Sequence, residues 1–336
     1  MTTIADVAAR AGVSKATASR ALSGHGYVSP LTRERVERAA QELSYIAHSG
    51  ATNLATGRMQ TVGVIMPSVD RWYFAELLAG LQQALVDAQL DLVLYNAPEG
   101  SPARERMLDH ALSRRRFDGI IAVCVQPGTD ELERLEAAGL PLVTVGPFHE
   151  RSSAVSIDDP AAARVATEHL IDLGHEDIAF LGGIPEPDRF GIGDEWRAAG
   201  YRAAMGSAGL ADRIREVPAA STIPDAFTAA VDLLADRRRR PTAIVAVCDE
   251  SAIGTIVAAR RLGIGVPSEL SVVGIDDHRY AEMFALTTIR QNPLAQGAEA
   301  VRLLLDRMAD PEGAAEHVLA PSSLVVRSST AGPRTG

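Results

Sequence analysis

The chain has 336 residues, of which 46% are hydrophobic and 23% charged, so we expect two or three folding units with sizeable cores. No apolar run approaches a membrane span and no charged-then-apolar leader opens the chain, so we expect a soluble cytoplasmic protein with no membrane partner. The formal net charge is −10, but residues 1–60 carry +3, so a small basic head precedes a body of −13. Cys124 and Cys248 each end an apolar run, which indicates reduced thiols on buried strands.

The first 24 residues predict two short helices joined by a tight turn. Apolar or small side chains recur at helical spacing up to Gly12, where a residue without Cβ strain suits the turn. Ser14 is a good N-cap for the second helix, which we expect to end near Gly24. The small residues Ala8 and Ala18 allow two helices to cross closely, as in a helix-turn-helix.

The second of these helices carries a polar face that suits DNA reading. The outer side of its N-terminal half holds Lys15, Ala16, Ser19 and Arg20. Such motifs present side chains from this part of the helix to the major groove. Arg20 suits a two-pronged contact to guanine, Lys15 can reach guanine or phosphate, and Ala16 can touch a thymine methyl. The alternative is a solvated face on an ordinary helix pair, and the basic charge of the segment favours DNA.

A third helix is predicted from Thr32 to Ser44, with Thr32 as its N-cap. Its apolar stripe would close a three-helix core and consists of Val36, Ala39, Ala40 and Leu43. The following stretch is polar, contains Gly50 and Gly57, and has Leu54 as its one large apolar residue. By composition it is a linker.

From Thr61 onward, short apolar runs alternate with helical stretches, which predicts parallel sheets flanked by helices. Arginine runs at 114–116 and 237–240 each precede an apolar run. We expect them at helix C-termini, where cations are stabilising, although nucleic-acid patches are the alternative.

Several polar and aromatic residues follow the predicted strands, at the sheet edge where open α/β proteins bind ligands. They are Trp72, Tyr73, Phe74, Asp158, Arg197, Asp249 and Asp276. Carboxylates with an arginine suit a hydroxyl-rich ligand, and the aromatic run could stack on a sugar ring or a base. For each aspartate alone, a turn or helix N-cap is the alternative.

These features form one extended pattern: IADVAARAGVSKATASRAL, VSPLTRERVERAAQELSYI and ATNLATGR near the N-terminus, then GYRAAM, AVCDESAIGTIVAARRLGIGVPSELSVVGIDD and LTTIRQ in the body. The pattern resembles the lactose-repressor/galactose-repressor (LacI/GalR) family over nearly the whole chain. The resemblance implies an α/β fold: a three-helix helix-turn-helix head at 1–46, a hinge at 47–60, and a two-lobed, periplasmic-binding-protein-like domain with parallel sheets at 61–336. That domain would bind the effector and dimerise, with lobe 1 at about 61–160 and 290–321 and lobe 2 at about 161–289 and 322–331.

For DNA, the resemblance implies that Lys15, Ala16 and Arg20 read bases. The implied phosphate contacts are Thr3, Ser14, Thr17, Ser19, Tyr27, Ser29 and Thr32. Residues 51–56 would fold on the operator, and Leu54 would wedge into the minor groove. His48 and Ala18 depart from the asparagine and valine that are usual in the family, and neither removes a base reader.

For the body, the resemblance places five of the candidate residues between the lobes. They are Tyr73, Phe74, Asp158, Arg197 and Asp276. Cys248 stands where many sugar-responsive members have asparagine, so one amide that would hold a sugar hydroxyl is missing. We therefore expect an effector that can differ from a simple hexose.

The expected function is a ligand-responsive transcriptional regulator, most simply a repressor, that binds a palindromic double-stranded DNA operator as a homodimer. Its small-molecule effector would be a sugar or sugar derivative. The alternatives are a solute-binding protein or an α/β enzyme, but there is no Walker loop and no G-x-S-x-G motif. His169 and His175 lack the spacing of metal ligands. We therefore expect no catalytic residues, cofactor or metal.

Overall fold

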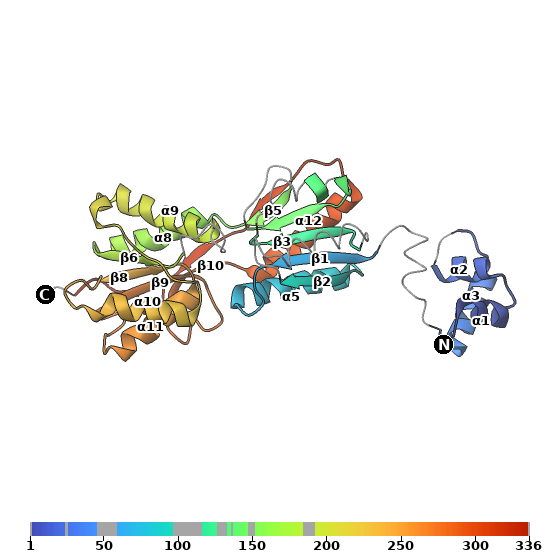
Figure 1. Ribbon diagram of the computed structural model, residues 1–336, viewed down its shortest axis with the longest axis horizontal. Coiled ribbons are helices and arrows are strands. Elements are labelled where there is room, and N and C mark those ends of the chain that lie inside the picture. The colour runs from blue at the N-terminus through green and yellow to red at the C-terminus, as the bar shows by residue number, and fades with distance from the viewer. Residues whose placement is uncertain are drawn as a thin grey trace. The chain divides into compact units, whose positions relative to one another are not determined.

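The computed structural model describes residues 2–23, 26–45, 59–96, 116–125, 133–135, 137–146, 152–183 and 192–334. The chain divides into two compact units, Met1–Gln60 and Thr61–Gly336, and each is described by itself (Figure 1).

The described residues of the first unit form three helices: α1 (Ile4–Ala11), α2 (Lys15–Ser23) and α3 (Pro30–Glu42). The turn after α1 is made by Gly12 in the left-handed region, at φ 64°, where a side chain would be strained. One small core joins the three helices and consists of Val7, Ala8, Ala11, Ala18, Ala21, Val36, Ala39 and Ala40. The helix-turn-helix head predicted from the sequence is thus confirmed.

The start of α3 differs from the prediction. Ser29, not Thr32, is the N-cap, because its hydroxyl accepts a hydrogen bond from the Thr32 backbone N–H at 3.3 Å. Pro30 then occupies the first helical position, where a missing N–H costs nothing. The prediction started the helix two residues late because it overlooked this proline.

The described residues of the second unit form two sheets, each in its own lobe. The sheet of the first lobe runs in the order β11-β5-β4-β3-β1-β2, and all its pairs are parallel. Its strands are β1 (Thr61–Met66), β2 (Asp91–Asn96), β3 (Gly119–Val123), β4 (Leu142–Val145), β5 (Ser153–Ser156) and β11 (His317–Leu319). Helices α5 (Trp72–Asp87) and α12 (Pro293–Ala309) pack against each other in this lobe.

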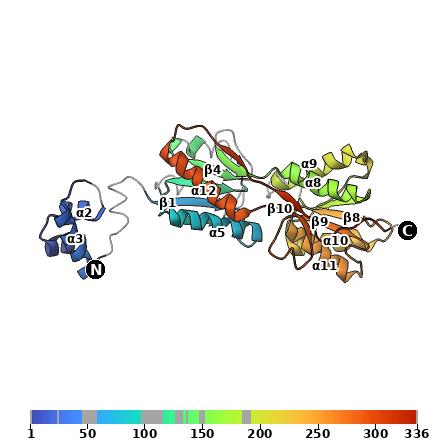
Figure 2. The ribbon, with the colours of Figure 1, turned by 180° about the vertical axis from the view of Figure 1, so that it is seen from behind.

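The sheet of the second lobe runs in the order β12-β10-β9-β8-β6-β7, and only the β10–β12 pair is antiparallel. Its strands are β6 (Ile178–Leu181), β7 (Arg215–Val217), β8 (Ala243–Ala246), β9 (Ser271–Asp276), β10 (Thr287–Arg290) and β12 (Ser323–Val325). The helices of this lobe are α8 (Asp159–Asp172), α9 (Ile192–Ser207), α10 (Ile223–Ala235) and α11 (Asp249–Arg261), with a 3-10 turn at Ala211–Arg213. Figure 2 shows α8 and α9 on one face of the sheet and α10 and α11 on the other.

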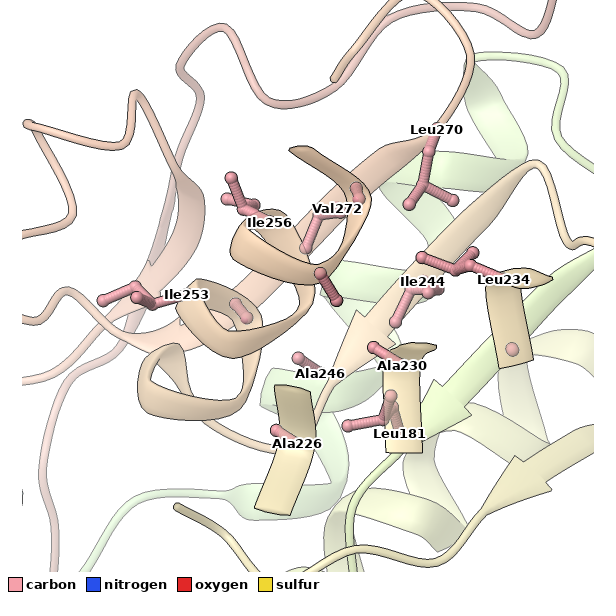
Figure 3. Packing of buried hydrophobic residues seen from close by; sticks show 14 of the residues in the cluster. Leu181, Ala226, Ala230, Leu234, Ile244, Ala246, Ile253, Ile256, Leu270 and Val272 are labelled. Carbon is pink, nitrogen blue, oxygen red and sulfur yellow. The ribbon is translucent and has the colours of Figure 1, made fainter. Parts of the chain in front are cut away.

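Both faces of the second sheet are buried, which explains its near-continuous apolar strands. Along β8, Ile244 and Ala246 pack against α10 and α11, and Figure 3 shows this layer. Their neighbours Ala243 and Val245 pack in the cluster on the opposite face, with α8 and α9. The alternating α/β body predicted from the sequence is confirmed.

The chain crosses between the two lobes three times: from β5 to α8, from β10 to α12, and from β11 to β12. Residues far apart in sequence therefore meet where the lobes meet.

One arginine of the second run lies as expected for a helix end. Arg240 Nε donates to the Leu234 carbonyl at 3.0 Å, near the C-terminus of α10. In the first run, Arg114 and Arg115 lie outside the described residues.

Candidate functional site

The outer face of α2 presents the residues predicted to read DNA. Lys15, Ala16 and Arg20 are exposed, whereas Ala18 is fully buried in the head's core. The buried side of the helix therefore fixes its orientation and leaves these three side chains free to meet a partner. Ser19 is half-buried on the same helix.

Most of the hydroxyls predicted to touch phosphates already have local partners at helix starts. Ser14 Oγ accepts from the Thr17 backbone N–H at 3.1 Å, and it also hydrogen-bonds the Thr17 hydroxyl. Ser29 donates to the Thr32 hydroxyl at 2.9 Å. Helix N-terminal backbone N–H groups attract phosphate as well, so a capping role is compatible with a phosphate contact.

Two further predicted contacts differ from these. Thr3 is the N-cap of α1, and its backbone N–H and its hydroxyl both donate to Asp6 Oδ2 at 2.8 Å. Tyr27 is 90% exposed, which is unusual for so large a side chain and suits a partner surface. Leu54 and His48 lie outside the described residues.

In the second unit, Arg197 is the centre of a buried charge cluster. Its Nε donates to Asp159 Oδ1 at 2.7 Å, and its guanidinium also lies 3.8 Å from Asp276 Oδ1. A third contact goes to the Val247 carbonyl at 2.7 Å. Burial opposes the charge of Arg197, but the Asp159 and Asp276 carboxylates raise its pKa above the usual value. The guanidinium is therefore held as a fixed cation.

A chain of hydrogen bonds connects this cluster to the first lobe. Gln291 Nε2 donates to Asp276 Oδ1 at 2.6 Å, and Gln296 Nε2 donates to Gln291 Oε1 at 2.9 Å. Tyr73 then donates its hydroxyl to Gln296 Oε1 at 2.8 Å. We call Tyr73, Asp159, Arg197, Asp276, Gln291 and Gln296 the interlobe cluster. It offers carboxylates, amides and a guanidinium, the groups that pair with the hydroxyls of a polar ligand.

Sequence reasoning missed three of its members. Gln291 and Gln296 lie beyond β10 and at the start of α12, and the order of strands gave no reason to inspect that connection. Asp159 directly follows the predicted Asp158. The Asp-Asp pair itself was the signal, and only the backbone decides which carboxylate turns inward.

Asp158 is exposed and acts as the N-cap of α8, where its Oδ1 accepts from the Ala161 backbone N–H at 2.8 Å. The structure does not bring it to Arg197, and its neighbour Asp159 makes that contact instead. Asp158 is therefore a helix cap, which is the alternative that the sequence left open for each aspartate.

Asp249 is fully buried at the start of α11 and contacts residues of its own lobe. Thr288 Oγ1 donates to its Oδ1 at 2.6 Å, and the His278 backbone N–H donates to its Oδ2 at 2.7 Å. Burial and the nearby Asp276 carboxylate raise the pKa of Asp249 to about 8. Burial also raises the pKa of Asp276, to about 6. Asp249 therefore lies near Asp276 as a supporting residue and is not a member of the interlobe cluster.

The three aromatic residues at the start of α5 turn in different directions. Tyr73 joins the interlobe cluster, whereas Phe74 is 5% exposed and packs in the core of the first lobe. The Trp72 ring lies 4.8 Å from the ring of His278, which belongs to the second lobe. The predicted run thus contributes one hydrogen-bonding group, one core residue and one contact between lobes.

Arg71, just before this run, was also missed by the sequence reasoning. Its Nε donates to Glu250 Oε2 of the second lobe at 3.0 Å, and its NH2 lies 3.5 Å from Cys248 Sγ. The guanidinium therefore lies beside Cys248, the position at which the resemblance implies an asparagine in many sugar-responsive members.

Neither cysteine is poised for chemistry. Burial raises the pKa of Cys124 to about 12 and that of Cys248 to about 11, so both are protonated thiols at neutral pH. In the described ranges no three metal-ligating side chains gather, and no helix there is long and apolar enough to cross a membrane. A pocket of about 510 Å³ lies elsewhere in the second lobe, near Arg260 and Phe284.

Comparison with known proteins matches both units. The family model described as "Bacterial regulatory proteins, lacI family" matches residues 3–48, and a periplasmic binding protein-like domain matches residues 167–330. Catabolite control protein A of Priestia megaterium is 32% identical over 98% of this chain and 99% of its own length. The transcriptional repressor PurR of Vibrio campbellii is 32% identical over 93% of each chain.

Solved structures agree with these matches. The lac repressor dimer bound to operator and the anti-inducer ONPF is 26% identical, with a TM-score of 0.85 over 98% of this chain and 99% of that one. The complex of the transcriptional regulator CelR with cellobiose is 28% identical, with a TM-score of 0.70 over 98% of this chain and all of that one. From the helix-turn-helix head, the two-lobed body and these full-length matches, the chain belongs to the lacI family of bacterial regulatory proteins.

Proposed function

We propose that this protein is a cytoplasmic, ligand-responsive transcriptional repressor, without enzymatic activity, that binds a palindromic operator as a homodimer. A small metabolite, a sugar or sugar derivative, controls its affinity for DNA from between the two lobes. The observation that carries the proposal is the exposed row of Lys15, Ala16 and Arg20 on α2, in a chain that also holds the buried interlobe cluster.

On the DNA side, α2 enters the major groove and its N-terminal half meets the base edges. Arg20 donates two hydrogen bonds to a guanine, Lys15 reaches guanine or phosphate, and Ala16 contacts a thymine methyl. Ser14 and Thr17 at the start of α2, and Ser29 and Thr32 at the start of α3, contact the phosphates. In support, the lac repressor structure that this chain matches carries an operator.

Residues 47–60 are the proposed hinge between the head at 1–46 and the body at 61–336. On the operator, the hinge orders and Leu54 enters the minor groove. Unstacking one base step costs free energy, but the bent duplex that results makes more contacts with the protein. Two heads of a dimer then read two half-sites, and this matches the symmetry of a palindrome.

On the ligand side, the effector accepts from Arg197 and donates to Asp159 and Asp276. Because Tyr73 and Gln296 come from the first lobe, a ligand that engages this cluster binds one arrangement of the lobes more tightly than another. The ligand can change the affinity for DNA by no more than the ratio of its own affinities for the two arrangements of the lobes. The cellobiose and ONPF complexes among the matching structures support a small-molecule ligand for this chain.

A solute-binding protein or an α/β enzyme is the alternative, and either would use the body without the head. The test is operator binding by the full chain, measured by fluorescence anisotropy at fixed salt. Arg20→Ala should weaken specific binding by about 1–3 kcal/mol for each half-site, which is roughly five- to 140-fold per half-site. Arg38→Ala is the matched control, because Arg38 is exposed on α3 and pairs with Glu34 on its own helix. Equal affinities for Arg20→Ala and the unchanged chain would refute the DNA-reading assignment.

A further inference from the structure

A second group of side chains lies where the first turn of α5 meets the second lobe. It consists of Arg71, Trp72, Cys248, Glu250 and His278, and we call it the Arg71 corner. Arg71 Nε donates to Glu250 Oε2 at 3.0 Å, and the side chains of this pair are only 23% and 14% exposed. The Trp72 ring contacts His278 across the same junction. Of these groups only Trp72 is predicted from the sequence to contact the ligand, and its predicted role is ring stacking.

The indole of Trp72 gives the first sign of an absent partner. Its Nε1–H is buried, and no atom of the described residues accepts a hydrogen bond from it. A buried donor without an acceptor is costly, and such groups are rare in folded proteins unless they serve a binding role. The unpaired N–H therefore points to an acceptor atom outside the described residues, and a bound ligand is such an acceptor.

The guanidinium of Arg71 gives the second sign. It has five N–H donors, of which Nε faces Glu250 and one NH2 hydrogen faces Cys248 Sγ, a weak acceptor. Within the described residues no acceptor faces its NH1 group. Arg71 therefore keeps donor capacity in the same corner of the molecule.

The charges of the corner select among possible acceptors. Glu250 neutralises Arg71, and one of its oxygens also lies 3.5 Å from the Trp72 backbone nitrogen. An anionic group placed here would face the Glu250 carboxylate in a poorly solvated position, at a cost. An uncharged carbonyl oxygen can accept from Trp72 and Arg71 without that repulsion, and an amide beside it can donate to Glu250.

We propose that Trp72 and Arg71 determine effector specificity by holding the carbonyl oxygen of an uncharged, hydroxyl-rich ligand, such as an N-acylated amino sugar. Its hydroxyls engage the interlobe cluster, so the assignment rests on the proposed function. Cys248 is 1% exposed and its thiol is only a weak hydrogen-bonding group, whereas an amide side chain there would compete for the same donors. At position 248 the protein therefore lacks an amide donor. The donors of Trp72 and Arg71 take its place and bind the ligand's acyl group.

The experiment uses the full chain and five probes: N-acetylglucosamine and its β-1,4 dimer, glucose, cellobiose and glucuronate. Calorimetry should show the acetamido probes binding roughly tenfold more tightly than their hydroxyl counterparts. Trp72→Phe, which removes only the indole N–H donor, should bring the two series within about twofold of each other. Trp196→Phe is the matched control, since it deletes the same group from the chain's only other tryptophan.

Three results would overturn the assignment: no binding by the acetamido probes at millimolar concentration, glucuronate binding as tightly as they do, or an acetamido preference that survives Trp72→Phe. If glucose or cellobiose binds without any acetamido preference, the corner assignment fails while the proposed effector site stands. The operator assay with Arg20→Ala decides the DNA-binding function independently of every probe.

Discussion

At the residue scale, the pair Asp158 and Asp159 shows where sequence reasoning ends. The run of two aspartates after β5 predicts an acidic group at a strand end, and both candidate roles, a helix cap and a ligand contact, are present. Which residue takes which role depends on the first turn of α8. Backbone geometry turns Asp158 back onto the Ala161 N–H and points Asp159 at Arg197, and no local pattern distinguishes the two.

This division predicts different outcomes for two adjacent substitutions. Asp159→Asn should weaken effector binding at least tenfold, because it removes the charge that holds Arg197. Asp158→Asn should leave the response intact, since asparagine caps helices as well as aspartate does. An effector is first found by thermal-shift screening of sugars, nucleosides and phosphorylated metabolites. The measurement is then the effector concentration that gives half of the maximal change in operator affinity. A larger effect at Asp158 would reverse the assignment.

Asp249 leads to a prediction about pH. Its pKa is raised to about 8 by burial and Asp276, from an ordinary value of 3.8, so between these values the folded chain holds a proton that the unfolded chain releases. The free energy of unfolding therefore falls as pH rises through this window, by at most about 1.4 kcal/mol per pH unit for this one group.

Asp249→Asn should flatten this dependence. The amide can accept from the His278 N–H and donate to Thr288 Oγ1, so the variant retains both contacts. Urea unfolding from pH 5 to 8 should show a shallower loss of stability in the variant than in the unchanged chain. Parallel pH profiles would show that Asp249 does not carry the raised pKa.

At the element scale, the alternation of apolar runs with helical stretches was sufficient to predict the α/β body, because each parallel strand needs a crossover helix. The pairing of α5 with α12 was not predictable, since these helices lie more than 200 residues apart and pack only after the chain returns from the second lobe. Their close approach depends on glycine. A Cβ at Gly80 would lie 2.0 Å from the Leu294 carbonyl oxygen, and one at Gly297 would lie 2.4 Å from the Leu77 carbonyl oxygen.

Gly80→Ala should therefore force the two helices apart and destabilise the body by about 1–3 kcal/mol or more. It should also weaken effector binding, because α5 carries Tyr73 and α12 carries Gln296. Gly206→Ala on α9 is the control: a Cβ there meets nothing within 4 Å, so the change should be neutral or stabilising by about 0.5–1 kcal/mol. Denaturant midpoints measure both variants, and equal midpoints would contradict the close packing.

At the scale of the whole molecule, cross-lobe contacts were beyond the reach of sequence reasoning. Arg71 pairs with Glu250 at a separation of 179 residues, and Arg279 pairs with Glu76 at a separation of 203. Such pairs depend on three chain crossings that no local spacing encodes. The distribution of charge, in contrast, can be read directly: a head of +3 precedes a body of −13, so attraction to DNA is confined to the head.

This asymmetry predicts how salt should act on operator binding. Each cation held against the duplex releases about one condensed counterion, and a dimer brings two copies of Lys15, the only lysine of the chain. Lys15→Gln should therefore reduce the slope of log affinity against log salt by about two, measured by anisotropy between 50 and 200 mM salt. Arg239→Gln removes an exposed charge from the acidic body, and its slope should equal that of the unchanged chain. An equal loss of slope in both variants would place DNA against the body as well and would overturn the confinement of DNA binding to the head.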